Sequence, residues 1–405
     1  MKKLVLVLIA VLLLTFAFAA NVAVAEEATV DSRAQHGEIY TFVQELCERN
    51  KSDKESARTY LKEKFTEALG DAWFVEEQQF RIDDNKYVNL VAEISKPNAD
   101  GQIIIGAHYD TVFDGGKRYE GAGDNACGIA ALYQTMKTFA SMKLNALPYS
   151  VVFVAFDGEE EGLLGSEYYV SKMSAKAIES TRVMFNFDTI ATGDNLYFMC
   201  ENKPTDLAKL ILSKADGIQE KPYAKGTFGN VYDLYGYGYY ETVQGSDHTP
   251  FRLAGIPTAF FFSGTYSATV WSYAESTDPN KAVTNTQRDT FENLVALHPD
   301  FESRIATVSN AVVDTVLSAE ILTIDTRGQL VNLNFWYNAW WPIVAIAVIG
   351  VACIVIAIFY FRKLQKNAIL GESEIKTQTV FEKPSAEDIF SFGSDDSDDI
   401  FTFKK

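Results

Sequence analysis

The sequence VVFVAFDGEEEGLLGS, at residues 151–166, decides the fold class of this chain. Its first six residues are apolar and run into Asp157, after which three glutamates follow at 159–161. A short apolar run bounded by glycine predicts a buried strand. Carboxylates at the end of such a strand are costly unless positive charge meets them, and no Lys or Arg lies between Asp157 and Glu167. The compensating charge must therefore come from elsewhere.

Buried strands alternate with helices on both sides of this stretch. The pattern predicts strands at Trp73–Ile82, Tyr87–Ile94, Gln102–Ala107, Tyr149–Phe156, Arg182–Phe187 and Ile256–Phe262, and helices at Gln35–Leu69, Cys127–Phe139, Gly162–Ser174 and Pro299–Leu317. This alternation predicts an α/β sandwich around a mostly parallel sheet. No repeat or low-complexity linker divides residues 26–330, which we therefore expect to form one globular domain.

Polar side chains follow the predicted strands, at the edge where such sheets bind ligands. They are His108 and Asp110, Glu159 and Glu160, Asp188, and Asp124 at the start of a helix. Each alone has an ordinary explanation, such as a helix cap, a first-turn acid or a turn former. Together, an imidazole and several carboxylates form a ligand set that suits zinc, manganese or cobalt.

Six motifs then resemble, in the same order, those of the co-catalytic zinc aminopeptidase family, whose fold is shared by glutamate carboxypeptidase, glutaminyl cyclase and the non-catalytic nicastrin. They are GAHYDTV (106–112), GAGDNACGIAAL (121–132), EEEGLLGS (159–166), FNFDTI (185–190), GSDHTPF (245–251) and DTFEN (289–293). The resemblance implies a three-layer α/β/α sandwich with a mixed, mostly parallel central sheet.

The resemblance also implies two zinc sites. Asp124 matches the carboxylate that bridges both metals, His108 and Asp188 match ligands of the first metal, and Glu160 matches a ligand of the second. Two such ions acidify a shared water and polarise the scissile carbonyl.

Glu159 matches the general base, which takes the proton of that water and passes it to the leaving amine. Asp110 matches a carboxylate that orients His108. Glu161 stands at a variable position of the motif, and we interpret it as a solvated acid.

One position departs from the family. In the stretch NTQRDTFEN, Asn285 stands where the last histidine of the second metal is expected. A neutral amide oxygen is a weaker zinc ligand than imidazole. We therefore expect a second site that binds weakly, prefers another divalent metal, or recruits His248, which lies beside Asp247 in a motif resembling an active-site loop.

The N-terminus has the layout of a secretory signal peptide. Lys2 and Lys3 precede an apolar run from Leu4 to Ala20, and the small residues of Ala23–Ala25 close it. This predicts a signal peptide at residues 1–25, with an uncleaved signal anchor as the alternative.

Residues 336–361 predict a transmembrane helix with an aromatic belt. The segment 341–361 carries no charge, aromatic residues flank both ends, and Arg362 and Lys363 follow at once. A cationic flank favours the cytoplasmic side. We thus expect a single-pass plasma-membrane protein whose domain 26–330 lies outside, with an acidic cytoplasmic tail at 362–405. The tail is predicted to be disordered and solvated, with docking of a cytoplasmic partner as the alternative.

Composition sets further limits. The 405 residues are 47% hydrophobic and 13% aromatic, which is ample for a large core. The net charge of −18 argues against a nucleic-acid partner. Of the four cysteines, only Cys353 lies in the predicted span, and one bridge, such as Cys47 with Cys200, stays open.

Three functions remain open at this stage. The first is a membrane-tethered zinc exopeptidase, an aminopeptidase acting on peptides; the second is a metal-poor receptor or scaffold like nicastrin; the third is an aminoacyl cyclase that uses one zinc. An aminopeptidase needs an acid for the substrate amine, and Glu161, Asp194 and Asp247 are candidates. The aromatic run Tyr235–Tyr240 suits a pocket wall, plain packing or a membrane-facing surface.

Overall fold

The computed structural model describes residues 36–70, 73–96, 99, 101–142, 149–200, 206–215, 217–220, 245–266, 273–326, 350–351 and 353–362. The predicted signal peptide, the run Tyr235–Tyr240, most of the predicted transmembrane segment and the tail beyond 362 lie outside them. The chain divides into two units, at 1–331 and 332–405. In the second unit, residues 350–351 and 353–362 are helical. Within the described part of the chain, every helix is too short or too polar to cross a bilayer.

The centre of the first unit is a mixed sheet, in which nine strands of the described residues take part. Their order is β1-β2-β6-β3-β7-β10-β8-β9, with β11 beside β10. The bounds are β1 Val75–Ile82, β2 Asn85–Ile94, β3 Gln102–His108, β6 Ser150–Phe156, β7 Thr181–Phe187, β8 Asn195–Met199, β9 Ile218–Glu220, β10 Thr258–Tyr266 and β11 Tyr273–Ala274. The four central strands, β6, β3, β7 and β10, are parallel to one another, and β2 and β8 pair antiparallel at their two sides.

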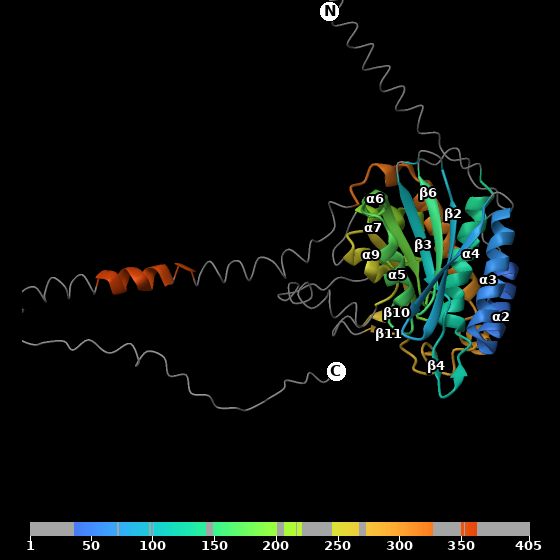
Figure 1. Cartoon of the computed structure of the whole chain (residues 1–405). Coiled ribbons are helices and arrows are strands. Elements are labelled where there is room, and N and C mark those ends of the chain that lie inside the picture. The colour runs from blue at the N-terminus through green and yellow to red at the C-terminus, as the bar shows by residue number, and fades with distance from the viewer. Residues whose placement is uncertain are drawn as a thin grey trace, which may run out of the picture. The chain divides into compact units, whose positions relative to one another are not determined.

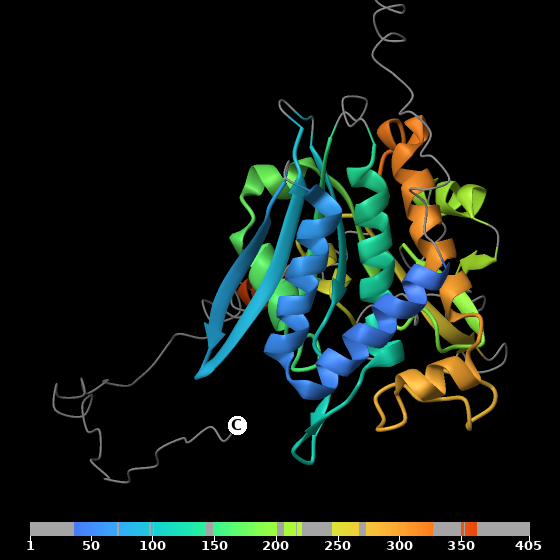
Figure 2. The same cartoon turned by 90° about the vertical axis from the view of Figure 1, so that its right-hand side faces the viewer.

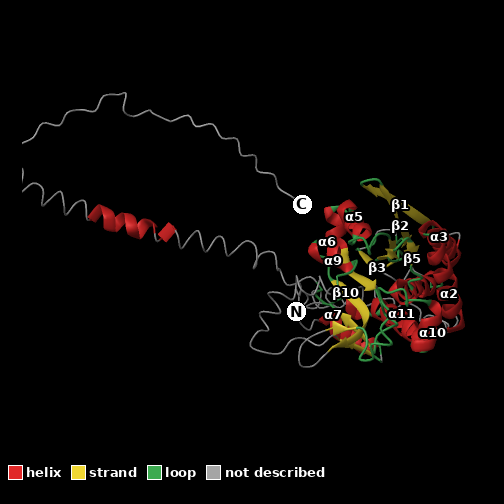
Figure 3. Ribbon diagram, turned by 90° about the horizontal axis from the view of Figure 1, so that it is seen from below, coloured by secondary structure: helices red, strands yellow, loops and turns green. Residues whose placement is uncertain are grey.

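Helices cover both faces of this sheet (Figure 1). One face carries α2 (His36–Ser52), α3 (Lys54–Leu69), α4 (Cys127–Ala140), α7 (Asp206–Lys214) and α11 (Phe301–Leu317), whose apolar residues share one large core. The other face carries α5 (Leu164–Lys172), α6 (Ala175–Ser180) and α9 (His248–Leu253), which pack on a second, smaller core. The predicted mixed α/β sandwich is confirmed, and Figure 3 shows its layers from below.

The central strands are apolar throughout because both of their faces are covered. In β3, Ile103 and Ile105 enter the larger core, whereas Ile104 enters the smaller one. In β6, Val151 and Val152 divide in the same way. Successive side chains of a strand point to opposite faces, so two covered faces require a continuous apolar run.

The predicted helical segment Gln35–Leu69 is confirmed, with a break that divides it into two helices, α2 and α3 (Figure 2). Asp53 separates them with an extended backbone, and its side chain accepts a hydrogen bond from the Ser56 amide at 2.7 Å. Such a cap satisfies an amide that has no partner within the helix. The break makes Lys54 the first residue of α3.

The cysteines carry no bridge. Cys47, Cys127 and Cys200 are buried, Cys353 is exposed, and no two of these described cysteines form a disulfide. The bridge between Cys47 and Cys200 that the sequence left open is therefore absent.

Candidate metal centre

Three parallel strands bring the predicted ligands to one edge of the sheet. His108 is the last residue of β3, Asp188 follows β7, and Glu159 comes three residues after the end of β6. Because β6, β3 and β7 are adjacent and parallel, their carboxyl ends meet. The fourth element is the turn η3 (Ala122–Ala126), which carries Asp124 and leads into α4.

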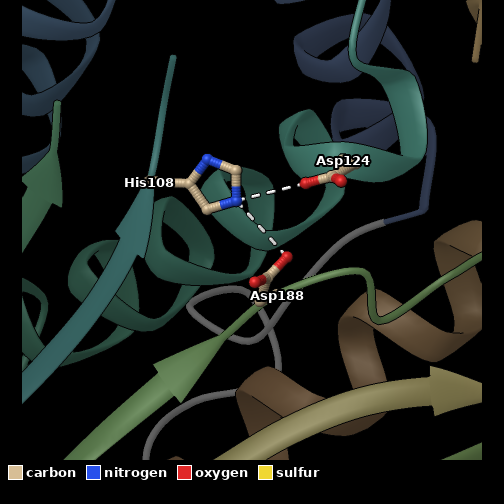
Figure 4. Close-up of side chains that lie close together, drawn as sticks. All are labelled: His108, Asp124 and Asp188. Carbon is tan, nitrogen blue, oxygen red and sulfur yellow. Dashed lines mark hydrogen bonds and ion pairs between the residues drawn. The ribbon is translucent and has the colours of Figure 1, made fainter. Parts of the chain in front are cut away.

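His108, Asp124 and Asp188 converge on one point (Figure 4). His108 Nε2 lies 3.1 Å from Asp124 Oδ1 and 3.3 Å from Asp188 Oδ1. One ligand atom from each residue falls within 4.8 Å of the others, and all three side chains are buried. Ligands of a tetrahedral zinc with bonds near 2.0 Å would lie roughly 3.3 Å apart. The donor set and its spacing thus fit a zinc ion.

The other nitrogen of His108 faces Asp110. His108 Nδ1 lies 3.2 Å from the Asp110 carbonyl oxygen and 3.7 Å from its carboxylate. A carbonyl partner at Nδ1 leaves Nε2 free for a metal. The Asp110 carboxylate itself accepts hydrogen bonds from the amides of Glu159 at 3.1 Å and Glu160 at 3.2 Å. Asp110 therefore fixes the backbone of both glutamates as well as facing His108.

The centre is short of positive charge. Burial, followed by the charge of neighbouring carboxylates, raises the pKa of Asp124 to about 6 and that of Glu160 to about 9. Burial also holds the pKa of Glu159 well above its ordinary value. Among the described residues, no Lys or Arg forms an ion pair with Asp124, Asp188 or these glutamates. A divalent cation would compensate this charge.

A cavity of about 150 Å³ opens beside these side chains. Carboxylates form one part of its lining, and two phenylalanines form an apolar part. The lining residues are Asp124, Glu159, Glu160, Asp188, Thr189, Gly245, Phe260, Phe262, Thr284 and Asn285. The predicted base, predicted ligands and room for a small substrate group thus lie together.

Residues 89–308, more than half of the chain, match the profile of peptidase family M28. The chain belongs to this family. The membership confirms the resemblance to zinc aminopeptidases that the six motifs predicted. All four segments of the centre, from His108 to Asp188, lie within the matched range.

Curated relatives of this M28 domain match it over part of their length. Leupeptin-inactivating enzyme 1 of Streptomyces exfoliatus is 30% identical over 179 residues, which cover 44% of this chain and 36% of the relative. Aminopeptidase YwaD of Bacillus subtilis is 29% identical over 164 residues, 40% of this chain and 32% of the relative. The matched part thus spans about a third of each relative. The crystal structure of LapB from Legionella pneumophila shares the fold, with a TM-score of 0.53, 18% identity, and coverage of 73% of this chain and 76% of LapB.

The remaining predicted residues of the M28 domain lie around the cavity at different depths. Asn285 is exposed and lines it, in a left-handed backbone conformation with φ of 57°. Asp247 and His248 are buried at the start of α9, and the imidazole of His248 stacks on Phe260 with ring centres 4.3 Å apart. Neither nitrogen of His248 has a hydrogen-bond partner among the described residues. The roles of these three residues stay predictions.

The first carboxylate of the opening stretch has a protein cation that the sequence did not reveal. Lys54 Nζ lies 2.8 Å from Asp157 Oδ1, and the Val88 amide donates to Asp157 Oδ2 at 2.8 Å. Lys54 is distant from Asp157 in the sequence. The helical pattern of Gln35–Leu69 does not predict that α3 begins at Lys54. A bound metal ion would therefore compensate the charge of the glutamates, whereas Lys54 compensates that of Asp157.

A second missed residue is Asp289, the aspartate of DTFEN. Its carboxylate is buried and accepts hydrogen bonds from the amides of Gly123 at 2.7 Å and Asp124 at 2.9 Å. DTFEN is one of the six family motifs, but no spacing rule predicts which backbone amides a buried carboxylate contacts.

Proposed function

We propose that this chain is a metal-dependent exopeptidase, an aminopeptidase that removes N-terminal residues from peptides. The observation that carries the proposal is the convergence of His108, Asp124 and Asp188 on one point, beside the carboxylate of Glu159. Membership of family M28 and the curated aminopeptidase relative support the same chemistry.

Zinc is the cofactor that these residues fit. His108 Nε2 and the carboxylates of Asp124 and Asp188 would hold it, since they supply one nitrogen and two oxygens at suitable separations. A zinc ion bound there supplies a Lewis acid that polarises a peptide carbonyl and acidifies water.

Glu159 is the proposed general base. It lines the cavity beside Asp124 and Asp188. Burial raises its pKa, which makes its carboxylate a stronger base toward the proton of a water. The hydrogen bond from its amide to Asp110 keeps the backbone in place during this transfer.

A second, weaker metal site is part of the proposal. Glu160 lines the same cavity, and its buried Oε1 has no hydrogen-bond partner among the described residues. Asn285 is the other candidate ligand, with Asp124 as the bridge. An amide in place of an imidazole predicts lower zinc affinity there.

The substrate amine needs an acid that is not otherwise engaged. Asp194 is engaged, because it accepts hydrogen bonds from the Ser276 hydroxyl and the Thr277 amide. Glu161 is exposed. The carboxylate of Asp247 is buried next to Ser166 and does not line the cavity, so the structure singles out none of the three candidates.

The proposed location is the plasma membrane, with the peptidase domain 26–330 outside and the tail inside. The support is the sequence alone: the apolar segment 341–361, its aromatic flanks and the cations that follow. Extraction of the full-length protein from membranes at alkaline pH tests this. Release into the supernatant would contradict a membrane span.

Hydrolysis of aminoacyl-nitroanilides by the purified full-length protein tests the exopeptidase activity. We expect turnover of leucyl-nitroanilide in the presence of zinc, and none of its N-acetylated form, because an aminopeptidase binds the free amine. Equal turnover of both compounds would contradict an aminopeptidase.

A metal-poor receptor or scaffold is the second candidate function, and Asn285 is the observation that favours it. It predicts a folded protein without turnover in zinc, cobalt or manganese. The same assay therefore separates the two functions.

A further inference from the structure

The segment that carries Asn285 also contacts the turn that carries Asp124. Asn285 lines the cavity, and Phe291, six positions further along the chain, begins α10 (Phe291–Leu297). Between them, Asp289 points its buried carboxylate at the turn η3. Only 2% of Asp289 is exposed, so its two hydrogen bonds are shielded from water.

The turn η3 needs such a partner. Asp124 and Asn125 have non-helical backbone angles, so the amides of Gly123 and Asp124 stand ahead of the regular ladder of α4. Buried amides without a hydrogen-bond partner destabilise a fold. Asp289 satisfies both at once, one with each carboxylate oxygen.

The packing around this contact leaves little freedom. A Cβ added at Gly123 would come within 2.2 Å of Thr192 and 3.2 Å of Asp289 Oδ1. On the other side of the turn, Asn125 donates to the Phe187 carbonyl at 2.8 Å and accepts from the Gly128 amide. The backbone that carries Asp124 is thus held from two directions.

Carboxylates hold paired amides at two further places around the centre. Asp110 accepts from the amides of Glu159 and Glu160. Glu275 accepts from those of Val283 and Thr284, directly before Asn285. The bridging ligand, the base and the segment with Asn285 are therefore each fixed through their backbone by one buried or half-buried acid.

We infer that Asp289 is a positioning residue of the metal centre, which sets the place of Asp124 by holding its backbone. The inference rests on the proposed metal site. The motif at 285–293 then has a structural role that does not depend on a histidine at position 285. Asp289 holds the backbone of the ligand Asp124 even if Asn285 binds metal poorly. A metal site is only as rigid as the groups that orient its ligands.

The test is metal affinity of the full-length Asp289→Asn variant, measured by competition with a chelator. An amide can accept one of the two hydrogen bonds but presents its NH₂ group to the other amide. We expect a loss of about 10–100-fold in zinc affinity, with a changed visible spectrum of the cobalt-loaded protein. The matched control is Asp300→Asn, because Asp300 is an exposed acid that pairs with Arg304 outside the centre. It should leave both readouts unchanged.

The outcomes separate this inference from the proposed function. A wild-type protein that takes up no metal would overturn both. A wild-type protein that binds zinc, with Asp289→Asn equal to it in affinity and cobalt spectrum, would overturn the role of Asp289 alone.

If the Asp289→Asn variant does not fold, hydrogen exchange of the metal-free wild type tests the inference instead. Because Asp289 already holds the amides of Gly123 and Asp124, a peptide covering Gly121–Ala126 should exchange slowly without metal. Exchange of all its amides within seconds in the folded protein would contradict the inference.

Discussion

Asp157 and Glu159 stand two residues apart after the same strand, yet the chain treats their charges differently. Asp157 is buried and receives a protein cation, Lys54, at 2.8 Å, together with the Val88 amide. Glu159 and the neighbouring Asp124 and Asp188 have no Lys or Arg partner in the described part of the chain, and the imidazole of His108 is their nearest basic group. Lys54 compensates the charge of Asp157, whereas a bound metal ion would have to compensate the charges of Glu159, Asp124 and Asp188.

The presence or absence of a protein cation distinguishes buried acids with a structural role from candidates for a functional one. A buried carboxylate with a built-in cation is fixed and unavailable for chemistry. Carboxylates that converge without one are what a metal site requires before its metal binds. Burial raises the pKa of Asp124 and Glu160 as it raises that of Asp157, so the missing cation is what distinguishes them. Each prediction below alters one side of this comparison.

The largest effect is expected from removing the proposed base. Glu159→Gln keeps the shape of the side chain but cannot take a proton, so turnover should fall by about 10²–10⁴-fold. Zinc content should stay at the wild-type value, because Glu159 is not a proposed ligand. The exposed neighbour Glu161 provides the matched control, and Glu161→Gln should remain close to the wild type in turnover. Equal losses in both variants would contradict the division of roles within the glutamate run.

Removal of a ligand should be the next largest effect. His108→Ala deletes the single nitrogen donor of the centre, and zinc affinity should fall by more than the roughly 10–100-fold typical of groups that only orient a ligand. Chelator competition measures it. His298→Ala serves as the control, since His298 contacts the Lys281 carbonyl away from the centre. Undiminished zinc affinity in His108→Ala would place the metal elsewhere.

The Lys54→Met variant removes the ion pair between Lys54 and Asp157. It leaves the Asp157 charge buried, and we expect a loss of about 2 kcal/mol in the free energy of unfolding, less than for a fully buried pair because Lys54 is partly exposed. Lys51→Met removes a mostly exposed partner of Glu120 and should cost clearly less, because water screens a surface pair. Urea unfolding of the metal-free proteins measures both. Similar costs would show that the Lys54 pair is no different from a surface pair.

The smallest effect is expected at the second metal site. Asn285→His restores the imidazole that the family motif predicts and should tighten a second zinc by about tenfold, since imidazole is the better zinc ligand. Titration of the singly loaded protein measures this. Gln287→His, an exposed position two residues further on, should leave the second affinity unchanged. If Asn285→His also leaves it unchanged, Asn285 is not at a ligand position.

The central sheet and the meeting of the ligands were predictable from the sequence. Apolar runs such as Ile103–Ile105 mark strands covered on both faces, and a parallel sheet then dictates that His108 and Asp188 share an edge. The family motifs added the match for Asp124, whose turn no periodicity rule describes.

The contacts between distant segments were not predictable. The break at Asp53 depends on one capping hydrogen bond, and it places Lys54 beside Asp157. The hold of Asp289 on the η3 turn joins residues 165 and 166 positions apart. Short elements at the far side of the sheet, such as β8 and α7, were also missed, because few residues leave too little periodicity to read.

Metal content and activity, measured together, test the central claim most directly. The full-length protein is purified, its zinc is counted per chain, and leucyl-nitroanilide hydrolysis is followed through chelation and re-addition of zinc. We predict at least one zinc per chain, with turnover that disappears on chelation and returns with zinc. A folded protein that holds no metal and shows no turnover in zinc, cobalt or manganese would contradict the account.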